Sequence, residues 1–149
     1  MEKDSPAGCC PTRPGCGRVA GVDLEQARQV VQLMVLAAWA DGHVEGSEAL
    51  TIHKLVVAHP ELREVGPTGD LSRTARERLL KLGMREAVRE SAAALHDRKY
   101  QELAFQCCAK VSGADGEFVP AEAELLAWLQ ELFGFSAAEV NRLLVLATR

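Results

Sequence analysis

The chain has few aromatic residues, no alternating polar and apolar run, and no excess of positive charge. Aromatic residues make up only 5% of its 149 residues, while alanine and leucine dominate the apolar 48%. No segment shows the period-two alternation of a half-buried β-strand. This composition favours helices packed on helices over sheets, and the length is that of a single globular domain.

Charge and hydropathy exclude two classes of partner. The net charge is −4, whereas recognition of phosphates needs a basic face, so we expect no nucleic-acid binding. The arginine-rich stretch 73–89 is interleaved with glutamates, which is typical of a solvated helix face. No apolar run approaches the roughly 18–20 residues of a transmembrane helix, and residues 1–6 lack the apolar core of a signal peptide. We therefore expect a cytoplasmic protein without membrane insertion.

The first 20 residues differ from the rest in composition. Proline and glycine recur there, and such a segment does not form regular structure. We predict a flexible leader over residues 1–20 and a folded domain over 21–149. Cys9, Cys10 and Cys16 lie in the leader, and their spacing matches no zinc or iron–sulfur pattern, which favours exposed thiols. Cys107 and Cys108 instead fall in an apolar helical pattern, where cysteine behaves as a small core residue.

Helix periodicity and capping residues predict seven helices. Asp23, Asp70 and Asp97 are candidate N-caps, Pro120 suits the first position of a helix, and Ser136 with Glu139 forms a capping box. Breaks are expected near Gly83 and Gly134, and an irregular connection near Pro60, Gly66, Pro67 and Gly69. The predicted helices cover residues 23–40, 46–58, 71–82, 85–95, 97–114, 120–134 and 136–147.

A short phrase occurs twice in the chain, each time between two predicted helices. Ala40-Asp41-Gly42-His43-Val44-Glu45-Gly46-Ser47-Glu48 returns as Ala114-Asp115-Gly116-Glu117-Phe118-Val119-Pro120-Ala121-Glu122. Both copies read Ala-Asp-Gly, with an apolar residue three positions after the Asp and a Glu seven positions after it. We infer an internal duplication of a helix–loop–helix unit, with residues 23–58 and 97–133 as pseudo-twofold halves and 70–95 inserted. The loops are then expected side by side, with Val44 and Phe118 buried near each other.

The repeated spacing resembles half of a calcium-binding loop. Asp-Gly followed after five residues by Glu is the second half of an EF-hand. The positions that supply the first two ligands hold Ala37 and Trp39 in one copy and Val111 and Gly113 in the other. None of these side chains has an oxygen, so a standard EF-hand is rejected.

The two aspartates still occupy an unusual place. Asp41 and Asp115 fall at the C-terminal end of a predicted helix, where the helix dipole disfavours a carboxylate by a few tenths to about 1 kcal/mol. One compensation is structural, with each Asp accepting hydrogen bonds from backbone N–H groups of the next helix. The other is a divalent cation (calcium, magnesium, manganese or zinc) bound by Asp41, Glu48, Asp115 and Glu122. The sequence leaves both open.

With the closing phrase Leu132-Phe133-Gly134-Phe135-Ser136, the two Asp-Gly motifs resemble the TerB-like domains. That family is named for a tellurite-resistance protein and also occurs at the N-terminus of a DnaJ-like membrane co-chaperone. The resemblance covers residues 23–148. It implies a compact all-α bundle with pseudo-twofold halves, an acidic site suspected of binding divalent cations, and an association with stress and tellurite-resistance systems. His43 and the cysteine-bearing leader depart from the pattern.

Three classes of function follow. The first is a non-enzymatic, metal-binding module of the stress or tellurite-resistance type. The second is a scaffold or co-chaperone-like interaction module without metal, because Asp115 to Glu139 contains acidic residues but no Lys or Arg and suits a basic protein partner. An enzyme is disfavoured, since the chain shows no nucleophile–base pair, phosphate-binding loop or histidine cluster. His53 and His59 are isolated, so we predict no catalytic residues.

Overall fold

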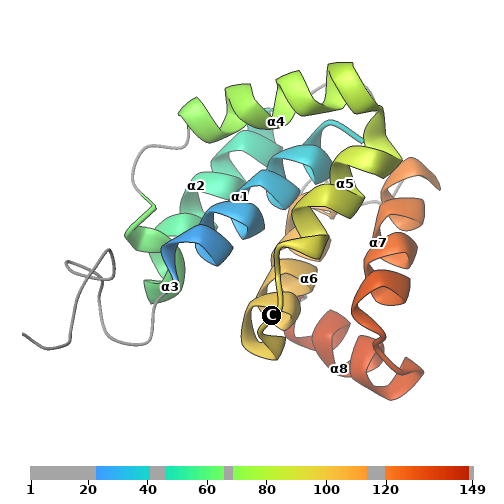
Figure 1. Ribbon diagram of the computed structural model, residues 1–149. Helices are drawn as coiled ribbons and strands as arrows, with labels where there is room; N and C mark the ends of the chain where they lie inside the picture. The colour runs from blue at the N-terminus through green and yellow to red at the C-terminus, as the bar shows by residue number, and fades with distance from the viewer. Residues whose placement is uncertain (1–22, 41–45, 66–68, 114–119, 148–149) are drawn as a thin grey trace, which may run out of the picture.

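The computed structural model describes residues 23–40, 46–65, 69–113 and 120–147, with the backbone alone for 46–49. In this part of the chain there are eight α-helices and no β-strand, which confirms the all-α prediction (Figure 1). None of these helices is long and apolar enough to cross a membrane. The helices are α1 (Leu24–Ala38), α2 (Gly46–Ala58), α3 (Pro60–Arg63), α4 (Gly69–Leu82), α5 (Met84–Ala93), α6 (Arg98–Ser112), α7 (Pro120–Phe133) and α8 (Ala137–Ala147).

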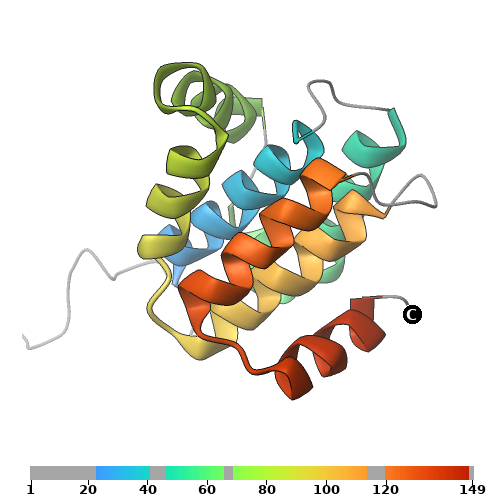
Figure 2. The same cartoon turned by 90° about the vertical axis from the view of Figure 1, so that its right-hand side faces the viewer.

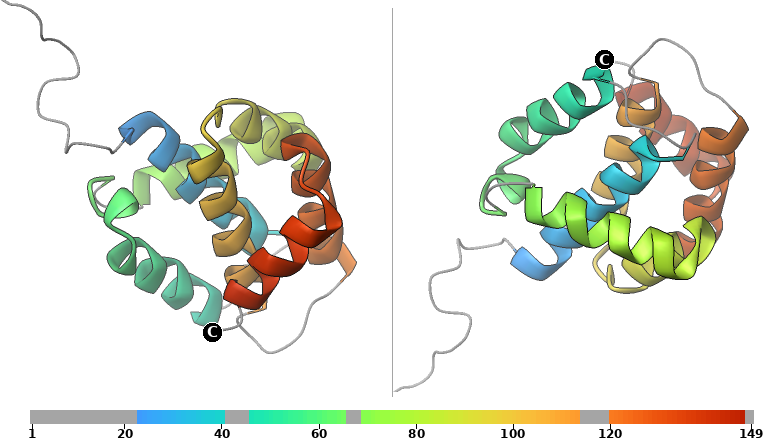
Figure 3. Two further views of the ribbon diagram at one scale, coloured as in Figure 1. Left: turned by 90° about the horizontal axis from the view of Figure 1, so that it is seen from below. Right: turned by 90° about the horizontal axis from the view of Figure 1, so that it is seen from above.

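Helix α1 forms the centre of the core. After its first turn nearly every residue is buried, and the helix packs most extensively against α6 and then against α4 and α5. Figure 3 shows α1 and α6 in the middle of the bundle, with α2 on one side and α7 on the other. A helix that is apolar almost all round must be enclosed by neighbours, and the inserted α4–α5 pair covers the face of α1 that α6 leaves free.

Buried polar contacts join the start of α1 to the start of α6. Gln26 donates from its amide to Asp23 Oδ2 (2.9 Å) and Asp97 Oδ2 (3.0 Å), and its Oε1 accepts from the backbone N–H groups of His96 and Asp97, each at 3.1 Å. The Tyr100 hydroxyl accepts from the backbone N–H of Asp23 at 2.6 Å. Both helices have 15 residues, begin together and run in the same direction (Figure 2). Their C-terminal ends, which precede the two repeat loops, therefore lie at the same end of the pair.

The order of elements agrees with the predicted duplication. Each half consists of a 15-residue helix followed by a second helix of 13 or 14 residues, α1–α2 and α6–α7. Their surroundings differ, however. Helix α2 packs against α1, α3 and α6, whereas α7 packs against α6 and α5. The duplicated halves thus share topology but not the same neighbours.

Most predicted helix ends are confirmed. Asp23 caps α1 by accepting from the backbone N–H groups of Glu25 and Gln26. In the capping box, Ser136 N donates to Glu139 Oε1 (2.9 Å) and Glu139 N donates to Ser136 Oγ (3.1 Å). Pro120 is the first residue of α7. Gly83 and Gly134 follow the last residues of α4 and α7 and have φ angles of 86° and 70°, a left-handed backbone conformation that glycine tolerates. Cys107 and Cys108 are both buried, which confirms the prediction that they are core residues.

Two local predictions were wrong, and a third was right in position only. The connection that begins at Pro60 contains the short helix α3, because proline is suited to the first helical position and Leu62 is fully buried. Asp70 is not an N-cap but lies in the first turn of α4, where it forms an ion pair with Arg73 at 2.6 Å. Asp97 precedes α6 as expected, yet its side chain makes no capping hydrogen bond.

Candidate functional site

Two of the four predicted metal ligands lie in described helices. Glu48 is the third residue of α2 and Glu122 the third residue of α7, so the two glutamates hold equivalent places in the two halves. Asp41, Asp115 and the side chain of Glu48 lie outside the described residues. The expected contact between Val44 and Phe118 also falls there. The structure therefore fixes the helices that flank the candidate site.

Glu122 is buried, with only 2% of its surface exposed. Its place in the first turn of α7 favours a carboxylate, because the backbone N–H groups at a helix N-terminus carry partial positive charge. Burial of a carboxylate costs free energy, and interactions of Glu122 within the fold offset part of this cost. Sequence periodicity predicted the position of Glu122 but gave no sign that this residue, unlike most glutamates, is enclosed.

A second buried oxygen lies just before the second loop. Ser112 is the last residue of α6 and is fully buried, and its hydroxyl has no hydrogen-bond partner among the described residues. It precedes Asp115 by three positions, the place that Ala38 occupies in the first copy. Our sequence analysis missed it. The available signal was a serine at a buried helical position directly before the repeated motif.

A positive charge lies beside the C-terminal end of α1. Trp39 follows α1 as its C-cap, and the guanidinium of Arg76 on α4 lies 5.8 Å from the centre of the Trp39 ring. This cation–π contact fixes α4 against the end of α1 that leads to Asp41. Arg76 thus places a positive charge two residues before Asp41 in the sequence, at the Trp39 ring.

The donor set fits a hard cation. Carboxylate and hydroxyl oxygens are the ligands that calcium, magnesium and manganese prefer. Among the side chains that the structure describes, no group of three or more His, Cys, Asp or Glu residues is placed to hold a metal ion. Asp41, Asp115 and the side chain of Glu48 lie outside this part of the chain, so a site that joins them to Glu122 stays a prediction.

The acidic stretch predicted as an interaction surface is only partly compensated. Glu139 lies 3.5 Å from Arg98, and hydrogen bonds from Ser136 together with nearby arginines hold the pKa of its carboxyl below the ordinary value. Glu124 and Glu131 on α7 are exposed and form no ion pair with any described residue. The uncompensated charge is thus concentrated on the outer face of α7.

The isolated histidines show no catalytic arrangement in the described part of the chain. His53 is exposed on α2. His59 is half-buried between α2 and α3, and burial lowers its pKa against an opposing effect of Glu61. Neither histidine has a recorded hydrogen bond from its ring to a nucleophile among these residues.

Comparison with known proteins assigns the chain to a family. The sequence model of one family, described as tellurite resistance protein TerB, matches residues 27–145, which is most of the chain. Comparisons with curated proteins and with solved structures gave no match. The matched range contains both Asp-Gly motifs and all eight helices except a few terminal residues. The chain therefore belongs to the TerB family and is a module of the tellurite-resistance type.

Proposed function

We propose that this TerB module binds a divalent cation through Asp41, Glu48, Asp115 and Glu122, without enzymatic activity and in the cytoplasm. The observation that carries the proposal is the equivalent placement of Glu48 and Glu122 in the first turns of α2 and α7, each seven residues after the Asp of the repeated motif. The parallel course of α1 and α6 supports it, because both repeat loops leave from the same end of this pair.

Convergence of four carboxylates would be unfavourable without a cation. At an effective dielectric constant near 20, two like charges 4 Å apart repel by about 4 kcal/mol. Protonation, a basic side chain such as Arg76, or a bound cation must offset this repulsion. Oxygen donors favour calcium, magnesium or manganese, whereas His43 in the first loop would be needed to favour zinc.

Calorimetric titration of the metal-free protein with calcium, magnesium, manganese and zinc tests the proposal. We expect one saturable binding event and a metal-dependent rise in melting temperature, since a cation at about 100 times its Kd stabilises the fold by about 2.7 kcal/mol. Asp41→Asn with Asp115→Asn should abolish both effects. Glu64→Gln with Glu77→Gln is the matched control, because both residues are exposed and lie outside the repeat.

Fluorescence of Trp39 reports on the site directly. In a Trp128→Phe background Trp39 is the remaining tryptophan, two residues before Asp41. Absence of heat and of a fluorescence change with all four metals would refute the proposal. If the double Asn variant destabilises the metal-free protein by more than about 2 kcal/mol, the aspartates act as structural caps, because this exceeds an ordinary lost hydrogen bond.

A further inference from the structure

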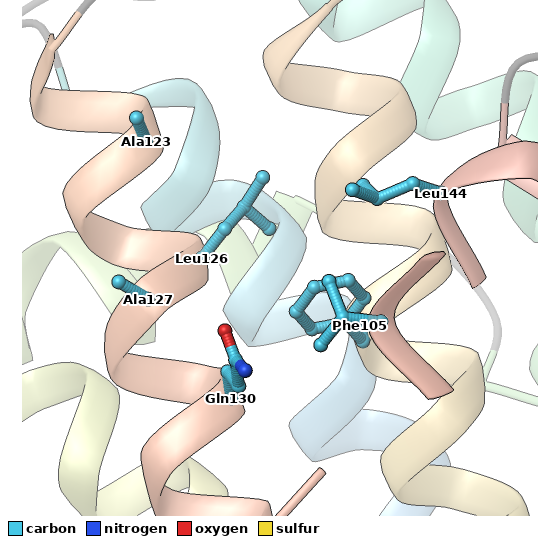
Figure 4. Close-up of a pocket in the computed structure, with 7 residues that line it drawn as sticks. Phe105, Ala123, Leu126, Ala127, Gln130 and Leu144 are labelled. Atoms are coloured by element: carbon cyan, nitrogen blue, oxygen red, sulfur yellow. The ribbon is translucent and has the colours of Figure 1, made fainter. Parts of the chain in front are cut away.

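A groove opens between α7 and α8 and begins at Ala123, the residue that follows Glu122 in the first turn of α7. It has a volume of about 280 Å³ and is apolar, with one amide at its edge (Figure 4). Leu126 of α7, Phe105 of α6 and Leu144 of α8 point into the space between the helices. The groove is lined by Phe105, Ala123, Leu126, Ala127, Gln130, Val140 and Leu144.

The groove exists because α8 covers α6 but not α7. Helix α8 packs against α6, and Leu143 is its one fully buried residue. Val140 and Leu144 lie next to this contact and are only partly covered. Ala123 and Ala127 form the opposite wall, and their small side chains leave the backbone of α7 open to close approach. A helix placed here would bury apolar surface that the fold itself leaves exposed to water.

One edge of the groove is acidic. Glu124, Ala127 and Glu131 follow one another at helical spacing along α7, so the two carboxylates flank a residue of the groove wall. They are separated by about 10 Å along the helix axis. Both are exposed, and neither forms an ion pair with a described residue. This edge therefore presents two uncompensated negative charges beside an apolar surface.

The basic residues near this edge form no ion pair with Glu124 or Glu131 among the described residues. Arg85 of α5 lies beside α7, with its guanidinium 5.7 Å from the centre of the Trp128 ring, one helical turn from each of these glutamates. The sequence has no Lys or Arg between Lys110 and Arg142. Arg142 forms an ion pair with Glu102 at 3.0 Å, and Arg98 donates to the backbone carbonyl of Phe133 at 2.8 Å and lies 4.6 Å from the Phe135 ring. The guanidinium groups of Arg98 and Arg142 are held on the α6 side and that of Arg85 lies over the Trp128 ring, so the two carboxylates remain available to a partner.

We propose that the groove binds an amphipathic helix of another protein, with apolar residues facing Phe105 and Leu126 and basic residues facing Glu124 and Glu131. An open apolar groove between two helices is the shape that accepts such a helix through side chains at positions i, i+3 or i+4, and i+7. The volume is below the range of about 300–1,000 Å³ typical of small-molecule pockets, and the open side would leave a small ligand in water. The acidic edge selects the charge of the partner.

A labelled model peptide tests this inference. The probe is an amphipathic helix of about 18 residues, or five turns, built from Leu and Lys, and the comparison peptide has the same Leu positions with Glu in place of Lys. Fluorescence anisotropy near physiological ionic strength, where the Debye length is about 8 Å, measures binding to the full chain. We expect the Lys peptide to bind at least about tenfold more tightly than the Glu peptide, a difference of about 1.4 kcal/mol.

Two groove variants and one control separate specific docking from general attraction. Ala127→Trp fills the groove from an exposed position, and Glu124→Lys with Glu131→Lys reverses the edge. Each should weaken binding of the Lys peptide by about tenfold, or 1.4 kcal/mol. Glu64→Lys with Glu77→Lys changes the net charge equally at exposed sites outside the groove, and should leave binding within about twofold, or 0.4 kcal/mol. Circular dichroism confirms that each variant keeps its helical content.

Several outcomes would overturn the proposal. Equal loss with the control pair would show that net charge alone attracts the peptide, and equal binding of the Glu peptide would remove the role of the acidic edge. The exposed Leu80 and Lys81 on α4 make a second copy of this chain the competing occupant. Self-association that disappears in Leu80→Glu would assign the groove to that copy instead. The Asp41→Asn and Asp115→Asn pair should keep peptide binding, which separates this test from the metal proposal.

Discussion

Gln26, Gln29 and Gln32 lie three residues apart on α1 and allow a test of how much the hydrogen bonds of a buried amide stabilise the fold. Gln26 is 1% exposed and Gln32 is 5% exposed, but their surroundings differ. The carboxamide of Gln26 makes four hydrogen bonds that join α1 to the start of α6. The Oε1 atoms of Gln29 and Gln32 have no hydrogen-bond partner among the described residues. Replacing Gln26 or Gln32 with leucine should therefore have opposite consequences.

Gln26→Leu should destabilise the protein by about 3 kcal/mol. It leaves the backbone N–H groups of His96 and Asp97 without an acceptor, at about 1 kcal/mol each for partly buried donors. It also removes the two bonds to Asp23 and Asp97, which we count at about 0.5 kcal/mol each because water can rehydrate both carboxylates. For a chain of this length the loss corresponds to roughly 10 °C in melting temperature.

Gln32→Leu is the matched control. The same change on the same helix removes a buried carbonyl oxygen that gains nothing from the fold, so stability should stay unchanged or rise by up to about 1 kcal/mol. Urea unfolding followed by circular dichroism measures both variants, with equal slopes required for comparison. A loss of less than about 1 kcal/mol for Gln26→Leu would refute the reasoning, since it would mean that water replaces the network without cost. An equal loss for both variants would attribute the effect to side-chain packing.

Three further predictions concern other parts of the chain. Burial raises the pKa of the Cys107 thiol to about 12 and that of Cys108 well above its usual range, so with Cys9, Cys10 and Cys16 replaced by serine, a disulfide reagent should label the unfolded protein but not the native one. Hydrogen bonds from Ser136 lower the pKa of Glu139 from its ordinary value of 4.5, so the ionised carboxylate stabilises the fold above pH 4.5. This contribution is lost as the pH falls below 4.5 and through the pKa of Glu139 in the folded protein. The difference in unfolding free energy between wild type and Glu139→Gln should therefore shrink over this pH range. Deletion of residues 1–20 should leave the melting temperature nearly unchanged, and a fall of several degrees would show that this segment packs on the domain.

Local sequence signals predicted most helix ends because the stabilising groups lie close together in sequence. The capping box of Ser136 and Glu139 and the break at Gly134 depend on residues within one turn. Asp97 shows where this logic fails. Its residue type and its position are those of an N-cap. Its carboxylate nevertheless accepts a hydrogen bond from Gln26, 71 residues earlier in the chain, and none from the first turn of α6. A tertiary partner thus replaced the local one, which no short sequence window reveals.

The sequence predicted where Glu48 and Glu122 lie in their helices but not how deeply the residues of the candidate site are buried. Repetition of the Asp-Gly motif placed Glu48 and Glu122 in the first turns of equivalent helices, and the structure confirms both placements. The burial of Glu122 and of the Ser112 hydroxyl depends on how α5, α6 and α7 pack together, which helical periodicity does not determine. The ligand role of the four carboxylates remains a prediction.

The unequal surroundings of the two halves account for where each proposed site lies. On the side of α1, the inserted α4 and α5 complete the core and leave few apolar side chains of that helix exposed. On the side of α6, the short α8 provides the cover, and only Leu143 is fully enclosed. The pairing of α1 with α6 places both loop-bearing ends together, whereas the partial cover by α8 leaves Leu126 and Phe105 facing an open groove. Among the described residues, the groove for which we propose a helical partner thus borders the second of the two equivalent helix pairs and not the first.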